Sequence, residues 1–376
     1  MKHELGPLRV MTLVGTRPEI IRLSKVIPLL DKFCEHTFVY TGQNDDPKLR
    51  DVFFRELSLR NPDVELTVRR DSSHAQIAAV IGEVGNVLAS QRPDRVLILG
   101  DTDSALGAIP AARMGIPVFH LEAGNRCYDN RVPEETNRRL IDQVSTVLLP
   151  YTERSKENLI REGFARDRIF VVGNPIGEVL AQIVSEEGDR TTVARSLGVE
   201  GPYALLSLHR AENVDDPDRL LRILSGCARV AKLFGGRVIF SVHPRTRKRL
   251  EALNHNAVEL DDFVLSEPFG LRAFVALQLG AKLILTDSGT VQEEAAILGR
   301  PSVVLRDATE RAETLEAGTT LLSGSDPDSI LACSRIALQL GTDWRLPSGY
   351  VPGPVSSTIV KIVLSRIPGS VGSFGD

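Results

Sequence analysis

The sequence predicts an α/β protein with two Rossmann-like domains, each a doubly wound parallel sheet, facing each other across a cleft. Three observations predict it. With 376 residues, the chain is too long for one ordinary core and suits two domains. Short apolar runs alternate with stretches of helical periodicity, as in parallel sheets with right-handed crossovers. The alternation weakens after Gly173-Asn174-Pro175 and then restarts, so we place the domain boundary there.

This boundary gives a first domain over residues 1–173 and a second over residues 174–355. Residues 356–376 should form a helix over 356–367 that packs back on the first domain, followed by a flexible tail at 368–376 that is rich in Gly and Ser.

The apolar runs and the periodic stretches predict the elements in order. In the first domain we expect strands at 8–14, 37–40, 95–99, 117–121, 146–149 and 169–172, with helices after Pro18 and at 74–89, from 133, and at 152–162. In the second domain we expect strands at 203–208, 238–242, 283–285, 302–305 and 320–322, with helices at 219–232, 271–279, 291–298 and 327–339.

Ionisable side chains follow several of these strands. They are Arg17, Asp101, Glu122, His209 and His243, with Glu134 on the helix after the loop 124–132. Because open α/β sheets bind ligands beyond the carboxyl ends of their strands, these groups should gather at one site. A single Asp in such a place is most often a cap, and a lone His is more often a hydrogen-bonding residue than a catalyst. Structural support of the loop by Glu122 or Glu134 stays open.

The stretch from Lys282 to Arg311 reads as a βαβ unit with the turn Thr286-Asp287-Ser288-Gly289-Thr290. Such a turn directs backbone N–H groups and the positive end of a helix dipole at one point, which suits a phosphate or diphosphate. The alternative is purely structural. Ser288 or Thr290 would be an N-cap, and Glu293 and Glu294 would be first-turn acids.

Composition excludes several classes of function. Hydrophobic residues make up 42% and charged residues 25% of the chain, and its net charge is −4 without a long run of one sign, which disfavours nucleic acid as a partner. The four cysteines are scattered, as expected in a reducing cytoplasm. The sequence contains neither an apolar run of membrane-spanning length nor a signal-peptide core. It also contains neither a metal-ligand motif nor a G-x-G-x-x-G turn, so we expect acid–base chemistry without a cofactor.

With these residues in view, the chain resembles the non-hydrolysing UDP-N-acetylglucosamine 2-epimerase family over nearly its whole length. The motifs that carry the resemblance are GTRPE at Gly15, GD at Gly100, HLEAG at His120, PEETNR at Pro133, LSLHRAEN at Leu206, SVHPRT at Ser241, TDSGTVQEEA at Thr286 and LRDATER at Leu305. Within the family, the short loop HLEAGNRCYDNRVPEETNR is similar to the branch that makes UDP-N-acetyl-L-fucosamine. That branch epimerises UDP-2-acetamido-2,6-dideoxy-L-talose for O-antigen or capsule polysaccharide.

The resemblance implies a GT-B-like, cytoplasmic homodimer that acts on a UDP-activated amino sugar. It implies the catalytic set Asp101, Glu122, Glu134 and His209. It also implies UDP and phosphate contacts from Arg17, Ser288, Gly289, Thr290, Glu294 and Arg311, with Phe274 near the uracil. Arg22 stands where relatives usually carry a lysine, and its planar fork could hold a phosphate or a carboxylate. Gln43 and His243 lie where some relatives have a second, regulatory site.

The chemistry that the resemblance implies is elimination of UDP to a glycal, followed by re-addition. A base takes the C2 proton as the C1–O bond to UDP breaks, and the proton then returns on the other face. Which carboxylate is base and which is acid stays open. The alternatives are a UDP-N-acetylglucosamine 2-epimerase, a hydrolysing epimerase, a glycosyltransferase of the same architecture, and a non-catalytic UDP-sugar sensor.

Overall fold

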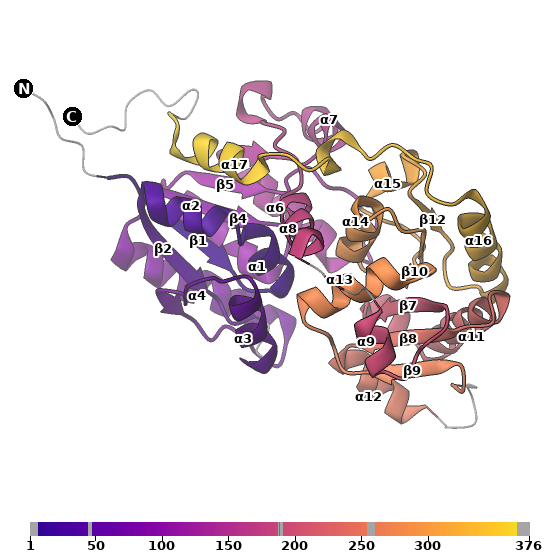
Figure 1. Ribbon diagram of the computed structural model, residues 1–376. Coiled ribbons are helices and arrows are strands. Elements are labelled where there is room, and N and C mark those ends of the chain that lie inside the picture. The colour runs from indigo at the N-terminus through magenta and orange to yellow at the C-terminus, as the bar shows by residue number, and fades with distance from the viewer. Residues whose placement is uncertain (1–6, 44–46, 187, 189–190, 254–259, 367–376) are drawn as a thin grey trace, which may run out of the picture. The chain divides into compact units, whose positions relative to one another are not determined.

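The computed structural model describes residues 7–43, 47–186, 188, 191–253 and 260–366 (Figure 1). The chain divides into two compact units. The first holds Met1–Val179 and Pro352–Asp376, and the second holds Leu180–Val351. The chain thus passes from the first unit to the second within helix α8 (Ile176–Glu186) and returns before the final helix, α17 (Val355–Leu364). The expected tail at 368–376 and the turn residues Asn44 and Asp45 lie outside the described residues.

The first unit contains a six-stranded parallel sheet in the order β3-β2-β1-β4-β5-β6 within the described residues (Figure 1). Its strands are β1 (Arg9–Val14), β2 (Glu35–Tyr40), β3 (Val64–Glu65), β4 (Arg95–Leu99), β5 (Val118–Leu121) and β6 (Val147–Leu149). The central strands β1, β4 and β5 are short and almost wholly buried, as expected for a sheet that is covered on both faces.

The second unit also contains a six-stranded parallel sheet in its described part, in the order β12-β11-β10-β7-β8-β9. Its strands are β7 (Tyr203–Leu208), β8 (Arg237–Val242), β9 (Phe263–Ser266), β10 (Leu283–Thr286), β11 (Ser302–Val304) and β12 (Thr320–Leu322). The doubly wound α/β fold that we expected is therefore confirmed in both units.

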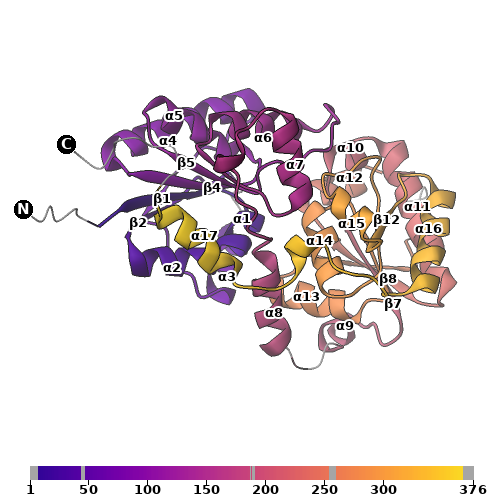
Figure 2. The same ribbon diagram turned by 90° about the horizontal axis from the view of Figure 1, so that it is seen from above.

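Helices cover both faces of each sheet (Figures 1 and 2). Those of the first unit are α1 (Arg17–Leu23), α2 (Val26–Phe33), α3 (Pro47–Glu56), α4 (Ser73–Gln91), α5 (Ala108–Arg113), α6 (Pro133–Val144), α7 (Glu153–Arg161) and α17, with 3-10 turns at Asp103–Gly107 and Arg166–Arg168. After α8 come α9 (Thr192–Ser196), α10 (Ala211–Val214), α11 (Pro217–Leu233), α12 (Pro244–Ala252), α13 (Leu271–Gly280), α14 (Gly289–Ile297), α15 (Ala312–Glu316) and α16 (Pro327–Leu340), with a 3-10 turn at Ser348–Tyr350.

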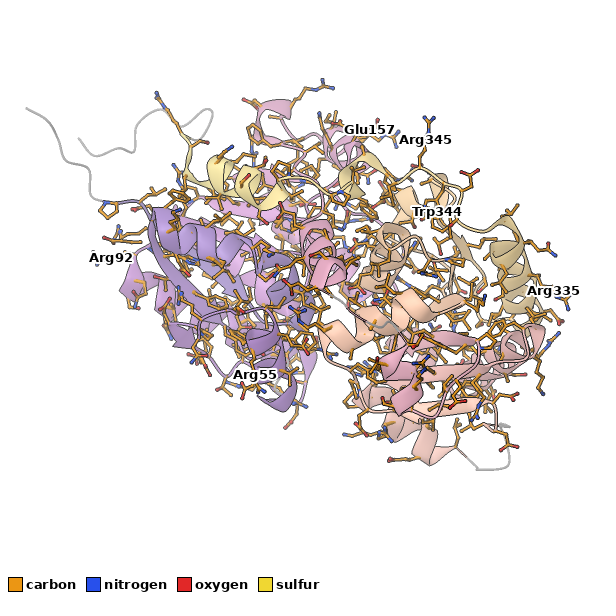
Figure 3. The ribbon with its side chains drawn as sticks, in the orientation of Figure 1. Arg55, Arg92, Glu157, Arg335, Trp344 and Arg345 are labelled. Atoms are coloured by element: carbon orange, nitrogen blue, oxygen red, sulfur yellow. The ribbon has the colours of Figure 1, made fainter. Side chains whose placement is uncertain are left out.

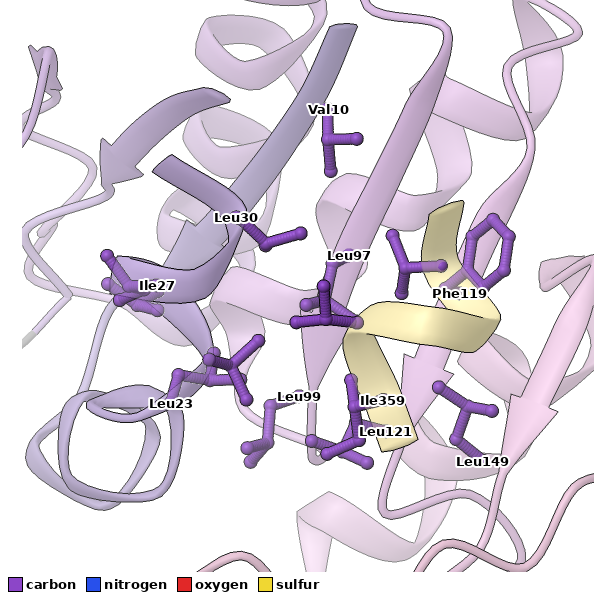
Figure 4. Packing of buried hydrophobic residues seen from close by; sticks show 14 of the residues in the cluster. Val10, Leu23, Ile27, Leu30, Leu97, Leu99, Phe119, Leu121, Leu149 and Ile359 are labelled. Atoms are coloured by element: carbon purple, nitrogen blue, oxygen red, sulfur yellow. The ribbon is translucent and has the colours of Figure 1, made fainter. Parts of the chain in front are cut away.

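Apolar side chains form a core on each face of each sheet. In the first unit, one core lies between the sheet and α1, α2 and α17, and the other lies under α4, α5 and α6. Figure 4 shows Ile359 of α17 packed among Leu97, Phe119 and Leu121 of the sheet. In the second unit, α11 and α16 cover one face, and α9, α13 and α14 cover the other. Helix α17 therefore completes the core of a unit whose other elements lie near the start of the chain.

Several charged side chains lie on the outside of the first unit. Arg55, Arg92 and Glu157, which are labelled in Figure 3, are exposed and point outward from the first unit. Among the described residues, no helix is long and apolar enough to cross a membrane.

Three expectations differ from the structure. The strand expected at 169–172 is only an isolated bridge between Ile169 and Leu148, because the sheet has already ended at β6. The single helix after Pro18 is two helices, α1 and α2, which meet at Ser24 and Lys25. Strands β3 and β9 were not predicted; β3 has only two residues, and β9 has only one buried residue, so neither has a clear apolar signal.

Candidate active site

Each sheet has a point at which its strand order reverses, and the predicted site residues lie beside these points. In the first sheet the reversal lies between β1 and β4, and in the second it lies between β7 and β10, so four of the predicted residues lie directly at these points. Chains that leave such neighbouring strands turn to opposite faces of the sheet, which opens a crevice at the carboxyl ends. Arg17 and Asp101 follow β1 and β4, whereas His209 and Ser288 follow β7 and β10.

Glu122 directly follows β5 and is held in an unusual backbone conformation. Its φ is +74°, in the left-handed region that side chains other than glycine seldom adopt. Its Oε2 lies 3.4 Å from a guanidinium nitrogen of Arg22, and its Oε1 accepts a hydrogen bond from the side chain of Asn125 at 3.1 Å. Glu122 and Arg22 are both buried. Backbone strain of this kind often occurs at functional sites. Arg22, which we expected to hold a phosphate or a carboxylate, thus contacts a carboxylate of its own unit.

Asp101 follows β4 and is paired with a residue that sequence reasoning missed. Arg138 of α6 donates to Asp101 Oδ2 from Nε at 2.9 Å and from a terminal nitrogen at 2.6 Å. The side chain of Asn137 donates to the carbonyl oxygen of Asp101 at 3.0 Å. Asp101 keeps 20% of its side chain exposed, so α6 fixes this carboxylate without enclosing it.

The two glutamates that open α6 have different surroundings. Glu135 is fully buried, and its carboxylate accepts hydrogen bonds from the backbone amides of Cys127 and Tyr128, at 3.0 and 3.2 Å. It also binds Arg138 and Arg139, both at 2.9 Å. Glu134 is half-buried in the first turn of α6. Glu135 therefore supports the loop 124–132, a task that we had left open for Glu122 or Glu134.

Two further predicted residues of the first unit lie at the same sheet edge. The guanidinium of Arg17 lies over the ring of Phe53, 5.8 Å from its centroid. The side-chain oxygen of Gln43 accepts hydrogen bonds from the backbone amide and the hydroxyl of Ser104, at 2.9 and 2.6 Å. Gln43 thus joins the turn after β2 to the segment after β4.

In the second unit, His209 is oriented by a buried carboxylate. Its Nδ1 lies 3.2 Å from Oδ1 of Asp287, which is completely buried after β10. Asp287 also accepts hydrogen bonds from the backbone amides of His209 and Arg210, at 3.1 and 2.9 Å. The ring of His243 lies 5.6 Å from the ring of His209, so the structure brings both histidines together.

Ser288, Gly289 and Thr290 form the start of α14, which begins two residues before the helix expected at 291–298. Ser288 is the N-cap, but its Oγ lies 3.5 Å from the amide of Val291, which makes the cap hydrogen bond weak. A Cβ at Gly289 would come within 2.6 Å of Oε1 of Glu310. Glu310 is itself held by Arg306 at 2.7 Å and by Arg210 at 3.2 Å. The carboxylate of Glu310 therefore lies directly against the backbone of Gly289, where a larger residue would clash with it.

Glu293 and Glu294 are not first-turn acids, because α14 begins at Gly289 and both lie in its second turn. Both are buried. Glu294 accepts a hydrogen bond from the side chain of Gln278 at 2.8 Å, and Glu293 forms an ion pair with the buried Arg311. Phe274 packs, half-buried, on the core under α13 and α14.

Among the described residues, no group of three or more His, Cys, Asp or Glu side chains is placed to hold a metal ion. The first unit instead presents carboxylates beside basic groups, and the second presents two imidazoles and a helix N-terminus. Carboxylates and imidazoles suit proton transfer, and a helix N-terminus suits an anion.

Comparison with known proteins decides the family. A family model described as UDP-N-acetylglucosamine 2-epimerase matches residues 30–364. The chain is 38% identical to the UDP-N-acetylglucosamine 2-epimerase of Methanocaldococcus jannaschii, over 95% of this chain and 99% of the relative. The chain belongs to the UDP-N-acetylglucosamine 2-epimerase family. It is therefore an isomerase.

Other relatives and solved structures extend this comparison. The chain is 34% identical to the UDP-2,3-diacetamido-2,3-dideoxy-D-glucuronate 2-epimerase of Pseudomonas aeruginosa, over 94% of this chain and 99% of that protein. The crystal structure of the Methanocaldococcus jannaschii enzyme with UDP-GlcNAc and UDP has a TM-score of 0.87, and the match covers 94% of this chain and 99% of that one. The glycosyltransferase WaaG, only 13% identical, matches over 95% of this chain and 100% of its own with a TM-score of 0.61 and shares the GT-B-like fold alone.

Four residues that support the site were missed in the sequence. They are Glu19, Arg138, Asp287 and Glu310. Asp287 and Glu19 stand inside quoted motifs, TDSGT and GTRPE, at strand ends, and this position was a usable signal. Arg138 follows Glu134 by four residues and so lies on the same side of α6. Glu310 also stands inside a quoted motif, LRDATER, but its approach to Gly289 depends on how β11 places the following loop.

Proposed function

We propose that this family member is a non-hydrolysing 2-epimerase of a UDP-2-acetamido sugar. One observation carries the proposal: acid–base candidates and a diphosphate-type turn lie at the two strand-order reversals of a chain that matches the family along almost its whole length. A relative with 38% identity has been crystallised with UDP-GlcNAc and UDP, which supports a UDP-sugar as ligand.

In the proposed reaction, the turn before α14 holds the diphosphate. The backbone N–H groups at Gly289 and Thr290 and the hydroxyl of Ser288 would stabilise the negative charge as UDP departs. A carboxylate among Asp101, Glu122 and Glu134 takes the proton from C2 while the C1–O bond to UDP breaks, which gives a glycal. A second acid returns a proton to the opposite face of C2, and UDP then adds again to C1. His209, oriented by Asp287, would take part as a proton donor or acceptor.

Solvent isotope exchange tests this mechanism. When the purified protein is incubated with UDP-2-acetamido-2,6-dideoxy-L-talose or UDP-N-acetylglucosamine in deuterated water, the epimerised product should carry deuterium at C2. Mass spectrometry and proton NMR measure this. Inversion without deuterium uptake would contradict elimination, and irreversible accumulation of UDP with free sugar would instead indicate a hydrolysing enzyme.

For the substrate, we propose UDP-2-acetamido-2,6-dideoxy-L-talose, converted to UDP-N-acetyl-L-fucosamine for surface polysaccharide. The support is the short loop NRCYDNRVPEE after Glu122, which Glu135 anchors through two backbone amides. The second candidate substrate is UDP-N-acetylglucosamine, and the names of the similar relatives favour it. Comparing kcat/KM for both nucleotide sugars separates the two. Faster turnover of UDP-N-acetylglucosamine would overturn the choice of the deoxy sugar.

A further inference from the structure

Glu19 links the two turns that bear the candidate site residues of the first unit. It lies in the first turn of α1 and is only 2% exposed. Its Oε2 accepts hydrogen bonds from the backbone amides of Gly15 and Thr16, at 2.5 and 3.1 Å. Its Oε1 accepts a hydrogen bond from the hydroxyl of Thr102 at 2.6 Å. One carboxylate therefore joins the turn after β1, which precedes Arg17, to the turn after β4.

The two turns are also packed closely against each other. A Cβ at Gly15 would come within 1.9 Å of Oγ of Ser104 and within 2.3 Å of Oγ1 of Thr41, and these two hydroxyls lie 2.6 Å apart. No side chain fits between the three strand ends at this point. A shift of the turn after β1 therefore has to move the segment after β4.

Burying the carboxylate of Glu19 in this turn costs desolvation free energy. Burial raises the pKa of Glu19 to about 7, although hydrogen bonds from Thr102, Gly15 and Thr16 lower it. Arg17 and Arg22 are close to it in the sequence, on α1, and the turn after β4, which it contacts through Thr102, carries Asp101 and Asp103. Thr16 is already the N-cap of α1, so a buried carboxylate at Glu19 costs desolvation that the cap alone does not require.

We propose that Glu19 is a positioning residue of the active site, which fixes the Asp101–Thr102 turn against the turn that carries Arg17. Asp101 is also held from the other side by Arg138, and Glu19 acts one residue away, through Thr102. Without this link the Asp101 carboxylate gains freedom relative to Arg17. The inference rests on the proposed function, because it assumes that Asp101 transfers a proton.

The variants Glu19→Ala, Glu19→Gln and Thr102→Val test the proposal in the full-length protein. A glutamine can keep the contacts, with its oxygen toward the two amides and its nitrogen toward the Thr102 hydroxyl oxygen. We expect Glu19→Ala to lower kcat at least about tenfold while KM changes less than about threefold, since small misplacements of catalytic groups cost rate. Glu19→Gln should restore most of the rate. Thr102→Val should also lower kcat, and the double variant Glu19→Ala/Thr102→Val should be no slower than Glu19→Ala alone.

The matched control is Asp94→Asn. Asp94 also links the starts of β1 and β4, because its Oδ2 accepts a hydrogen bond from the backbone amide of Arg9 at 2.8 Å, but it does so at the opposite end of these strands. This variant should lower the melting temperature and leave kcat unchanged. If Glu19→Ala keeps the wild-type kcat, or if Asp94→Asn lowers kcat as much as Glu19→Ala, Glu19 is merely structural and the proposal is wrong.

Hydrogen exchange tests the role of Glu19 independently of whether the proposed enzymatic function is correct. Amides of residues 101–104 should exchange faster in Glu19→Ala than in the wild type and in Asp94→Asn. If the wild-type protein epimerises no UDP-sugar, the proposed function fails. The exchange rates then still decide whether Glu19 fixes the turn, and unchanged rates would overturn that claim. If Glu19→Ala does not fold, the kcat of Thr102→Val and the exchange rates of its amides 101–104 decide whether Glu19 fixes the turn.

Discussion

At the scale of single residues, three of the four candidate acids and bases lie beside a group that fixes their direction. Arg138 holds Asp101, Arg22 and Asn125 hold Glu122, and Asp287 holds His209. Such partners set the orientation of a reacting group and its proton affinity. Variants of these residues can therefore separate the catalytic role of a carboxylate from its contribution to the stability of the fold.

Asp101→Asn should remove turnover and leave the fold intact. The amide keeps the shape of the side chain and can still accept from Arg138, but it cannot take a proton. We expect kcat to fall at least about 100-fold, the range of general acid–base catalysis. The melting temperature and the Kd for UDP should stay within experimental error, measured by calorimetry. Wild-type turnover in this variant would remove Asp101 from the catalytic set.

Glu19→Gln should change how stability depends on pH. In the folded protein burial raises the pKa of Glu19 from its ordinary value of 4.5 to about 7. The folded state then holds this proton more tightly than the unfolded state, so the wild type loses stability as the pH rises from 4.5 to 7. Each pKa unit corresponds to about 1.4 kcal/mol, so the loss is on the order of 3 kcal/mol.

The neutral glutamine has no such loss. The stability of Glu19→Gln relative to the wild type should therefore increase between pH 5 and pH 8. Urea unfolding of both proteins at the two pH values measures this. A difference that does not change with pH would mean that Glu19 titrates in the folded protein as it does in the unfolded chain.

At the scale of elements, the N-terminus of α14 has only a weak cap hydrogen bond, which leaves the Ser288 hydroxyl available to a ligand. The hydroxyl of Ser288 lies 3.5 Å from the amide of Val291, whereas Asp326, the N-cap of α16, accepts from the amide of Ser329 at 2.8 Å. Strong caps contribute about 1 kcal/mol, and a long hydrogen bond contributes less.

Ser288→Ala should consequently affect mainly UDP binding, whereas Asp326→Ala should affect mainly stability. Ser288→Ala should weaken UDP binding about tenfold, since a hydrogen bond to a charged group contributes roughly 1.5–3 kcal/mol, and should cost less than about 0.5 kcal/mol of stability. Asp326→Ala should cost about 1 kcal/mol of stability and leave UDP binding unchanged. Isothermal titration with UDP and urea unfolding measure the two quantities. An unchanged Kd in Ser288→Ala would show that this hydroxyl does not contact the diphosphate.

At the scale of the whole molecule, the last helix stabilises the first unit. Arg95 of β4 donates a hydrogen bond to the carbonyl oxygen of Ser365 at 2.6 Å, and the carboxylate of Glu178 accepts from the amide of Ser356. Together with the apolar contacts of Ile359, these bonds close a unit whose chain begins more than 300 residues earlier. Because each unit has its own core, a single two-state unfolding transition is not expected.

Ile359→Ala and Ile330→Ala are a matched pair of variants that tests whether the two units have separate cores. Both side chains are completely buried, the first in the core under α17 and the second in the core under α16. Each change should cost about 2–5 kcal/mol, but in different units. Hydrogen exchange should quicken in β4 for Ile359→Ala and in β7 for Ile330→Ala. Equal acceleration in both strands for either variant would contradict two separate cores.

The sequence by itself determined most of the elements and the turns that carry the candidate site, because these are local properties. Strands 95–99, 203–208 and 320–322 were predicted to the residue, since an apolar run of the right length has few alternatives. The turns GTRPE and TDSGT were also predicted, because glycine and capping residues specify them within a few positions. Their use by UDP stays a proposal.

Only the tertiary structure decided which side chains meet. Arg138 reaches Asp101 across 37 positions, and Thr102 reaches Glu19 across 83. Such contacts depend on the order of the strands in the sheet and on the helices between them, which no local pattern encodes. For the same reason, the sequence could not show that Glu135, rather than its neighbour Glu134, anchors the loop after Glu122. One position along α6 decides which carboxylate turns inward.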